Sequence, residues 1–213
     1  MRFNMRPLTL CLLLALPSCS MIEALDSASR PLDTYELRAV TAPPVSARRT
    51  LSRELVVERP GAGGALDTDR ILVRPNPLEA QYLPGARWTN PAPEMLQTLL
   101  VHRLEASDGF TYVGRRPLGA SGDYVLLSEL TDLQAEIVPA DGSVMARITL
   151  RARLIREDDA SVIAQDRFSA EAQAASDKAT DVVNALDAAL SEITPRLTGW
   201  VLQRTGAGSR PGA

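Results

Sequence analysis

The side chains that carry acid, base or metal chemistry are few in this sequence. His102 is the single histidine, and Cys11 and Cys19 are the two cysteines. A catalytic histidine needs a nucleophile or carboxylate beside it, and zinc or transition-metal sites combine several histidine or cysteine ligands. We therefore expect His102 to be a surface or boundary residue, and we expect no metal site, no cofactor and no enzymatic activity.

The glycine-rich segment Gly61-Ala62-Gly63-Gly64 invites comparison with a phosphate-binding loop. It lacks the Lys-Ser/Thr of a P-loop, and Leu66 stands where the third glycine of a dinucleotide fingerprint would be. Asp67 and Asp69 follow, but two carboxylates in a loop are more often solvated than bound to a hard cation. We predict a flexible, hairpin-like connection here.

The first nineteen residues have the layout of a secretory signal. Arg2 and Arg6 precede an apolar run from about Leu8 to Leu16, which is too short to span a bilayer core of about 30 Å. The run ends in Leu16-Pro17-Ser18-Cys19, which resembles a bacterial lipobox, with Pro17 as its unusual position. Cys19 is thus the predicted lipidation site; an ordinary signal peptide with an incidental cysteine is the alternative.

Acylation of Cys19 would divide the N-terminus into a lipoprotein signal peptide, residues 1–18, and a lipidated tether, residues 19–32. Cys11 would leave with the signal, and several acyl chains would make the attachment stable. Ser20 stands where an aspartate signals inner-membrane retention in enteric bacteria. By that analogy we expect an outer-membrane anchor with the domain facing the periplasm, the inner membrane being the alternative.

The composition is that of a globular protein, with 45% hydrophobic residues and a net charge of −3. The acidic balance and an aromatic content of only 4% argue against nucleic acid as a partner. Arg147, Arg151 and Arg153 alternate on the polar face of one predicted strand. They could meet anionic lipid headgroups or an acidic partner, but we favour a solvated sheet face with acidic neighbours.

Alternating and helical patterns predict a single α+β domain over residues 33–203, followed by a disordered tail over 204–213. The three longest strand signals are separated by turn residues, which indicates an antiparallel meander. We expect a mixed, largely antiparallel sheet with two main helices packed on one face. The predicted strands are 34–37, 51–59, 70–74, 110–113, 124–133, 144–155 and 162–171, and the predicted helices are 91–106, capped by Asn90, and 177–202.

Behind the lipobox, the order of these segments resembles the ABC-type transport auxiliary lipoprotein family, which includes the lipoprotein of the paraquat-inducible system. The similarity extends over about residues 33–203. The residues that carry it are Tyr35-Glu36-Leu37, Asp69-Arg70-Ile71, Tyr82, Arg87-Trp88, Pro91, Met95-Leu96, Leu100, Phe110, Tyr124-Val125-Leu126, Glu129-Leu130, Ile148-Thr149-Leu150, Leu154, Phe168-Ser169, Ala185-Leu186 and Trp200.

This resemblance implies a non-enzymatic partner of a transporter built from an ATPase, a permease and a mammalian-cell-entry (MCE) domain protein. Such a system moves phospholipid or other hydrophobic molecules between the inner and outer membranes, and the resemblance also allows a homo-oligomeric ring. Recognition could use an exposed strand edge, a helix groove or the Arg87-Trp88 loop, and Arg87 and Trp88 are the candidate partner-binding residues. For Trp88 we favour core packing under the preceding loop, with a partner-facing anchor as the alternative. A structural assembly lipoprotein of another outer-membrane complex, for lipopolysaccharide or secretion, is the alternative function, and a lipid-processing enzyme is a third.

Overall fold

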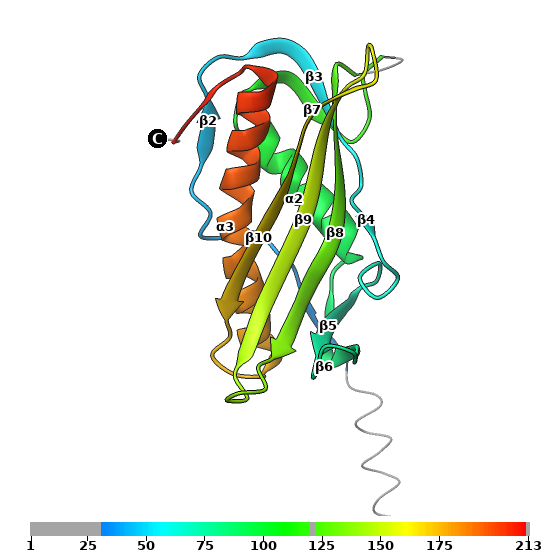
Figure 1. The fold of residues 1–213 in the computed structure, drawn as a ribbon, viewed down its shortest axis with the longest axis vertical. Helices are drawn as coiled ribbons and strands as arrows, with labels where there is room; N and C mark the ends of the chain where they lie inside the picture. The colour runs from blue at the N-terminus through cyan, green and yellow to red at the C-terminus, as the bar shows by residue number, and fades with distance from the viewer. Residues whose placement is uncertain (1–30, 120–121, 212–213) are drawn as a thin grey trace, which may run out of the picture. The chain divides into compact units, whose positions relative to one another are not determined.

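Three long strands form the centre of the sheet: β8 (Tyr124–Ile137), β9 (Val144–Arg156) and β10 (Ser161–Gln173). They pair antiparallel in chain order, which confirms the predicted meander (Figure 1). The computed structural model describes residues 31–119 and 122–211. The described residues from Asp33 onward form one compact unit, and the predicted signal peptide and the tether up to residue 30 lie outside the described residues.

The second edge of β8 is lined by three short strands that follow one another along the chain. β3 (Leu51–Val57), β4 (Gly61–Ala62) and β5 (Arg70–Arg74) all run parallel to β8. The glycine-rich segment therefore continues alongside the same strand, and the predicted hairpin-like connection is wrong. β7 (Phe110–Gly114) pairs with β3, β6 (Gln81–Trp88) pairs with β5, and β1 (Asp33–Tyr35) pairs with β6, which completes a mixed nine-stranded sheet.

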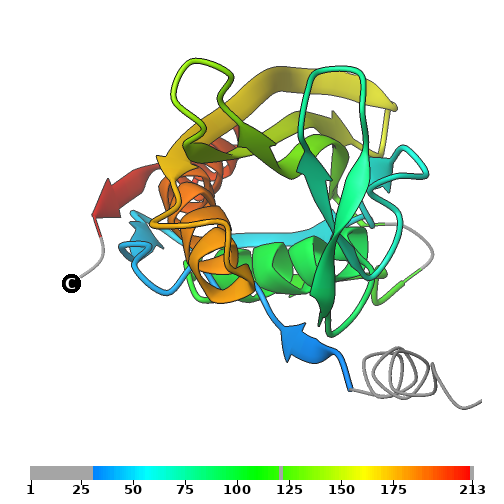
Figure 2. The same cartoon turned by 90° about the horizontal axis from the view of Figure 1, so that it is seen from below.

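Two helices, α2 (Ala92–Glu105) and α3 (Ala179–Thr205), pack on one face of this sheet, as predicted. Figure 2 shows the sheet curving around them. The apolar side of β9 faces the helices and includes Ile148 and Leu154, while Arg151 and Arg153 are exposed on the opposite face. The expected cap of α2 is wrong in detail, because the N-cap is Pro91 and no side chain bonds to the helix end. Neither α2 nor α3 is long and apolar enough to cross a membrane.

The predicted disordered tail is ordered in the structure as far as Pro211. α3 ends at Gly206, whose φ of +86° is a left-handed conformation that glycine adopts without steric cost. The chain then reverses, and β11 (Ser209–Pro211) pairs antiparallel with β2 (Val45–Ala47). Because backbone pairing and not side-chain burial holds this segment, its sequence shows no apolar pattern.

Asp123 joins β3 to the start of β8. Its carboxylate accepts hydrogen bonds from the Arg53 guanidinium, at 2.5 Å, and from the Glu54 amide, at 2.8 Å. Burial alone would raise the pKa of Asp123, but these donors outweigh it and hold the pKa below its ordinary value. This ion pair lies at the start of the parallel β3–β8 contact, whose register extends over three residue pairs.

Candidate partner-binding groove

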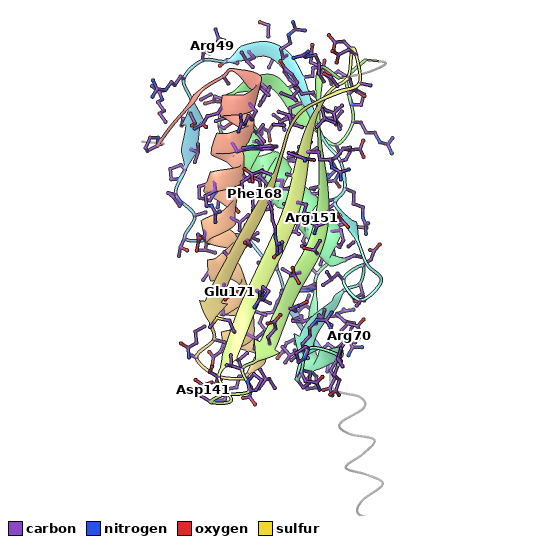
Figure 3. The ribbon with its side chains drawn as sticks, in the orientation of Figure 1. Arg49, Arg70, Asp141, Arg151, Phe168 and Glu171 are labelled. Atoms are coloured by element: carbon purple, nitrogen blue, oxygen red, sulfur yellow. The ribbon has the colours of Figure 1, made fainter. Side chains whose placement is uncertain are left out.

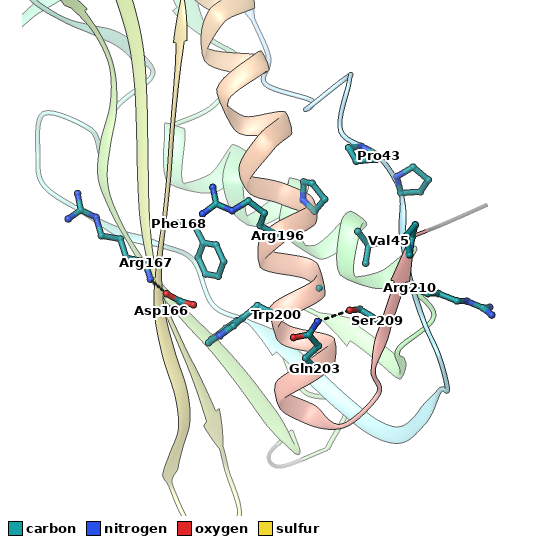
Figure 4. A pocket seen from close by; sticks show the side chains of 14 residues that line it. Pro43, Val45, Asp166, Arg167, Phe168, Arg196, Trp200, Gln203, Ser209 and Arg210 are labelled. Carbon is teal, nitrogen blue, oxygen red and sulfur yellow. Dashed lines mark hydrogen bonds between the residues drawn. The ribbon is translucent and has the colours of Figure 1, made fainter.

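A groove of about 560 Å³ runs between α3 and β10 and continues to the small β2–β11 sheet (Figure 4). We call it the α3–β10 groove. Its lining comes from four separate parts of the chain, which only the folded structure brings together. The lining residues are Pro43, Pro44, Val45, Asp166, Arg167, Phe168, Pro195, Arg196, Gly199, Trp200, Gln203, Ser209, Arg210 and Pro211.

An aromatic pair forms the apolar floor of the groove. Phe168 points inward from β10 and meets Trp200 of α3 edge to face, with ring centroids 5.7 Å apart and planes inclined at 72°. Both side chains are buried, at 4% and 8% exposure. The indole N–H of Trp200 has no hydrogen-bond acceptor among the described residues, although a buried unpaired donor costs about 1–3 kcal/mol. The N–H is itself buried, so a bound group would reach it only if the floor of the groove rearranged.

The width of the groove depends on Gly199, in the interior of α3. A Cβ built at this position would meet no atom closer than the Ser209 Oγ, at 3.7 Å. The position therefore tolerates a side chain sterically, although glycine lowers helix stability by about 0.8–1 kcal/mol relative to alanine. Glycine here leaves open the space between the helix and β11.

The rim of the groove is polar, and part of it covers the open edge of β10. This strand pairs only with β9 among the described strands. The Arg167 amide donates to the neighbouring Asp166 carboxylate at 2.8 Å, and the Arg196 guanidinium donates to the Ser169 carbonyl at 3.1 Å. These side chains occupy the backbone groups that an added strand would need, so the groove suits a ligand held by its side chains better than one added to the sheet.

One wall of the groove is held in place by a clamp on residues 38–40. The Asp187 carboxylate on α3 accepts the amides of Arg38, Ala39 and Val40 at 2.7, 2.7 and 2.9 Å. Arg103 on α2 donates to the Ala39 carbonyl at 2.7 Å. Since Pro43 and Pro44 follow within a few residues, the clamp determines where this wall stands.

Trp88 and Arg87, the predicted partner-binding residues, lie outside the groove and at the end of strand β6, not in a loop. Trp88 is 2% exposed and belongs to the hydrophobic core, which agrees with the core packing that we favoured for it. It therefore has almost no surface to offer a partner in this conformation. Arg87 is half exposed and lies 3.7 Å from Asp69.

The remaining candidate residues are placed on the surface or outside the described chain. His102 is exposed on α2. Asp67 pairs with Arg59 at 2.5 Å, and Asp69 pairs with Arg87, so each carboxylate of the acidic loop has a cationic neighbour. The groups that could hold a metal ion do not gather anywhere within residues 31–119 and 122–211. Cys19 lies outside the described residues.

A model of the ABC-type transport auxiliary lipoprotein component family matches residues 35–197. The chain belongs to this family. The match covers nearly all of the nine-stranded sheet, α2 and α3 as far as Leu197, and it ends before Gly199, Trp200, Gln203 and β11 of the groove. The family consists of auxiliary transport components and is not a known enzyme family, and its lipoprotein character places this protein at a membrane on the periplasmic side.

Solved structures agree with the family assignment. The auxiliary lipoprotein is similar to a crystal structure of protein XCC0632 from Xanthomonas campestris, of the family DUF330, with 30% identity and a TM-score of 0.70 over 83% of this chain and 95% of that one. A second crystal structure, of an uncharacterized protein, has 17% identity and a TM-score of 0.62 over 81% of this chain and 99% of that one, and so supports the fold.

A curated relative is longer than this protein. It is an uncharacterized protein of Bradyrhizobium diazoefficiens, 29% identical over 176 residues. The match covers 79% of this chain but 44% of the relative. The chain therefore spans less than half the length of that relative.

Proposed function

We propose that this protein is an outer-membrane-anchored periplasmic lipoprotein that serves as the auxiliary component of an MCE-type ABC transporter. The transporter would move phospholipids or other hydrophobic molecules between the two membranes. The family match supports the transport role, and the lipobox-like segment ending at Cys19 supports the anchor. The protein's own part would be to hold the MCE protein at the outer membrane.

The observation that carries the docking role is the α3–β10 groove. Its floor combines two aromatic rings, and its rim combines Arg196, Arg210 and Asp166. Aromatic residues and arginine dominate the energetics of protein interfaces, because they bury large areas around a few hydrogen bonds. We assign to the groove an extended segment of the MCE protein. Its apolar side chains would contact the aromatic floor. Its acidic side chains would pair with the rim arginines, which outnumber Asp166.

A substitution at Gly199 tests this docking site. Gly199→Phe is expected to fill the groove and reduce crosslinking of a photoreactive residue at Gln203 to the MCE protein by at least about tenfold, which corresponds to a loss of about 1.4 kcal/mol in binding. Gly199→Ala is the matched control, which adds one methyl group and should raise the free energy of unfolding by up to about 1 kcal/mol. The measurement is the yield of the crosslinked species from intact cells.

Two results would contradict the docking assignment. One is undiminished crosslinking by a folded Gly199→Phe variant. The other is recovery of lipopolysaccharide or secretion machinery, with no MCE protein, from the Gln203 position. That second outcome would favour the alternative role as an assembly lipoprotein of another outer-membrane complex.

Replacing Cys19 tests the anchor separately. Cys19→Ala removes the thiol that would be acylated, so we expect the protein to leave the outer-membrane fraction and the lipid-transport phenotype to be lost. Cys11→Ala is the control, because Cys11 would be removed with the signal peptide and its substitution should leave the fractionation unchanged. Cell fractionation followed by immunoblotting is the readout, and unchanged membrane association of Cys19→Ala would exclude lipid anchoring at this residue.

A further inference from the structure

The outer face of the sheet, on the side away from the helices, carries arginines at two levels along the strands. The two levels differ in how many carboxylates neighbour the arginines. Arg147 on β9 lies between two carboxylates, Glu136 of β8 at 3.2 Å and Glu171 of β10 at 3.1 Å. This level has the solvated, charge-balanced character that the sequence led us to favour. It contains its own counter-ions.

Further along β9, the arginines on this face outnumber the carboxylates that pair with them. The β9–β10 register places Arg151 directly opposite Arg167, and like charges in that position destabilise a sheet. Arg153 lies on the same face, two residues from Arg151. Glu129 forms an ion pair with Arg151 at 4.0 Å, and the neighbouring Asp166 accepts the backbone amide of Arg167. The side chains of Arg153 and Arg167 form no ion pair in the described chain. We call Arg151, Arg153 and Arg167 the arginine patch.

The surface around the patch is shaped to admit a group between the guanidinium groups. A shallow hollow of about 370 Å³ lies on the β10 side and is lined by Arg151, Arg153, Arg167, Gln165 and Asp166. A smaller one of about 90 Å³ lies on the β8 side, between Leu127, Glu129 and the same two β9 arginines. Figure 4 shows the side chains of Arg167 and Asp166 leaving β10 in opposite directions. Figure 3 places Arg151 midway along the long strands.

Exposed aliphatic side chains accompany the patch. Leu127, which pairs with Arg153 across the β8–β9 ladder, is 38% exposed, and Val162 near the start of β10 is 57% exposed. Basic groups beside exposed aliphatic groups are the combination found on surfaces that lie in the interfacial region of a bilayer. An acidic protein partner would account for the arginines but gives no role to the neighbouring apolar side chains.

We propose that the arginine patch binds the phosphate groups of anionic phospholipids, so that the outer face of the sheet lies on a membrane surface. This proposal rests on the lipid anchor of the proposed function, since Asp33 is fourteen positions beyond Cys19. A fully extended chain of that length reaches at most about 50 Å, so the anchor would keep the domain close to a bilayer. Each guanidinium offers paired N–H donors with the geometry of a phosphate.

The test uses the lipidated full-length protein reconstituted in vesicles, with a polarity-sensitive dye on a cysteine introduced as Leu127→Cys. Phosphatidylcholine vesicles containing phosphatidylglycerol should shift the dye emission to the blue, whereas phosphatidylcholine alone should not. Neutralising the patch as Arg151→Gln, Arg153→Gln and Arg167→Gln together should lower the equilibrium for this contact by roughly a hundredfold and abolish the shift. Arg147→Gln is the matched control and should keep it.

The other outcomes separate the possible ligands. A blue shift produced by inorganic phosphate without vesicles, or by an acidic peptide without vesicles, would overturn the membrane assignment. A shift that survives in the triple variant would overturn it as well. Because the triple variant removes like-charge repulsion, its melting temperature should not fall, which keeps loss of folding apart from loss of binding. Failure of the anchor would appear separately, as protein that does not float with vesicles of either composition.

Discussion

Trp88→Ala is expected to lower the free energy of unfolding by about 3–5 kcal/mol, the loss typical of a buried tryptophan. The indole is 2% exposed, in a strand that pairs with β1 on one side and β5 on the other. Removing it leaves a cavity that the flanking strands cannot close without breaking their registers. Urea unfolding of the purified lipoprotein, followed by far-ultraviolet circular dichroism, measures the change.

Arg87→Ala is the control from the adjacent position. Its side chain is half exposed and its contact with Asp69 is 3.7 Å long, so we expect a change within about 1 kcal/mol. A Trp88→Ala protein that unfolds like the wild type but no longer crosslinks to its partner would contradict core packing. It would restore the role of Trp88 as an exposed anchor.

The role of Trp88 illustrates which features the sequence could predict. The strands of the meander and both helices were predictable, because each carries its own period of apolar residues over ten or more positions. β6 was missed since Pro84 and Gly85 interrupt it, and Gly85 has a φ of +71°. Because Trp88 follows Pro84 and Gly85, its sequence context suggests a loop. In the fold, Trp88 lies in β6, which is paired with a strand on each side.

The groove could not be predicted from spacing. Its lining extends from Pro43 to Pro211, and the segments that carry it meet only through tertiary packing. β11 has no apolar alternation, and it depends on the reversal at Gly206 to reach β2. The Phe168 and Trp200 pair was visible as two aromatic residues in a chain poor in them, but the distance between the rings requires the register of β10 against α3.

The arginine residues show the same division between local pattern and tertiary arrangement. Their alternation on β9 follows from the two-residue period of a strand. Whether each arginine has a counter-ion depends on the registers of β8 and β10, and a bulge between Leu130 and Asp132 shifts one of them. The prediction of a balanced face is therefore confirmed at Arg147 and at Arg151, which has Glu129 at 4.0 Å, and fails at Arg153, which has Leu127 and Gln165 opposite it.

Asp187→Ala is expected to lower the free energy of unfolding by about 2–4 kcal/mol. The substitution removes the acceptor for three backbone amides, and hydrogen bonds to charged groups contribute about 1.5–3 kcal/mol each, less where water can replace the carboxylate. Ala39 is fully buried with a φ of +50°, so its amide has little access to water and its backbone is held in an unfavourable conformation. Without the carboxylate, residues 38–40 should leave this conformation.

Although Asp187 does not line the groove, the same substitution should weaken partner binding in the groove. Pro43 and Pro44 form one wall, and the Ala42 amide bonds back to the Ala39 carbonyl at 3.1 Å, so movement of the clamp displaces the wall. We therefore expect Asp187→Ala to reduce Gln203 crosslinking as well as stability, with Asp187→Asn intermediate because its amide oxygen still accepts. Asn184→Ala, an exposed change on the same helix, should shift stability by no more than about 0.5 kcal/mol and leave crosslinking intact. Full crosslinking by a destabilised but folded Asp187→Ala protein would show that the wall and the clamp are independent, since the groove would then keep its shape without the three amide bonds.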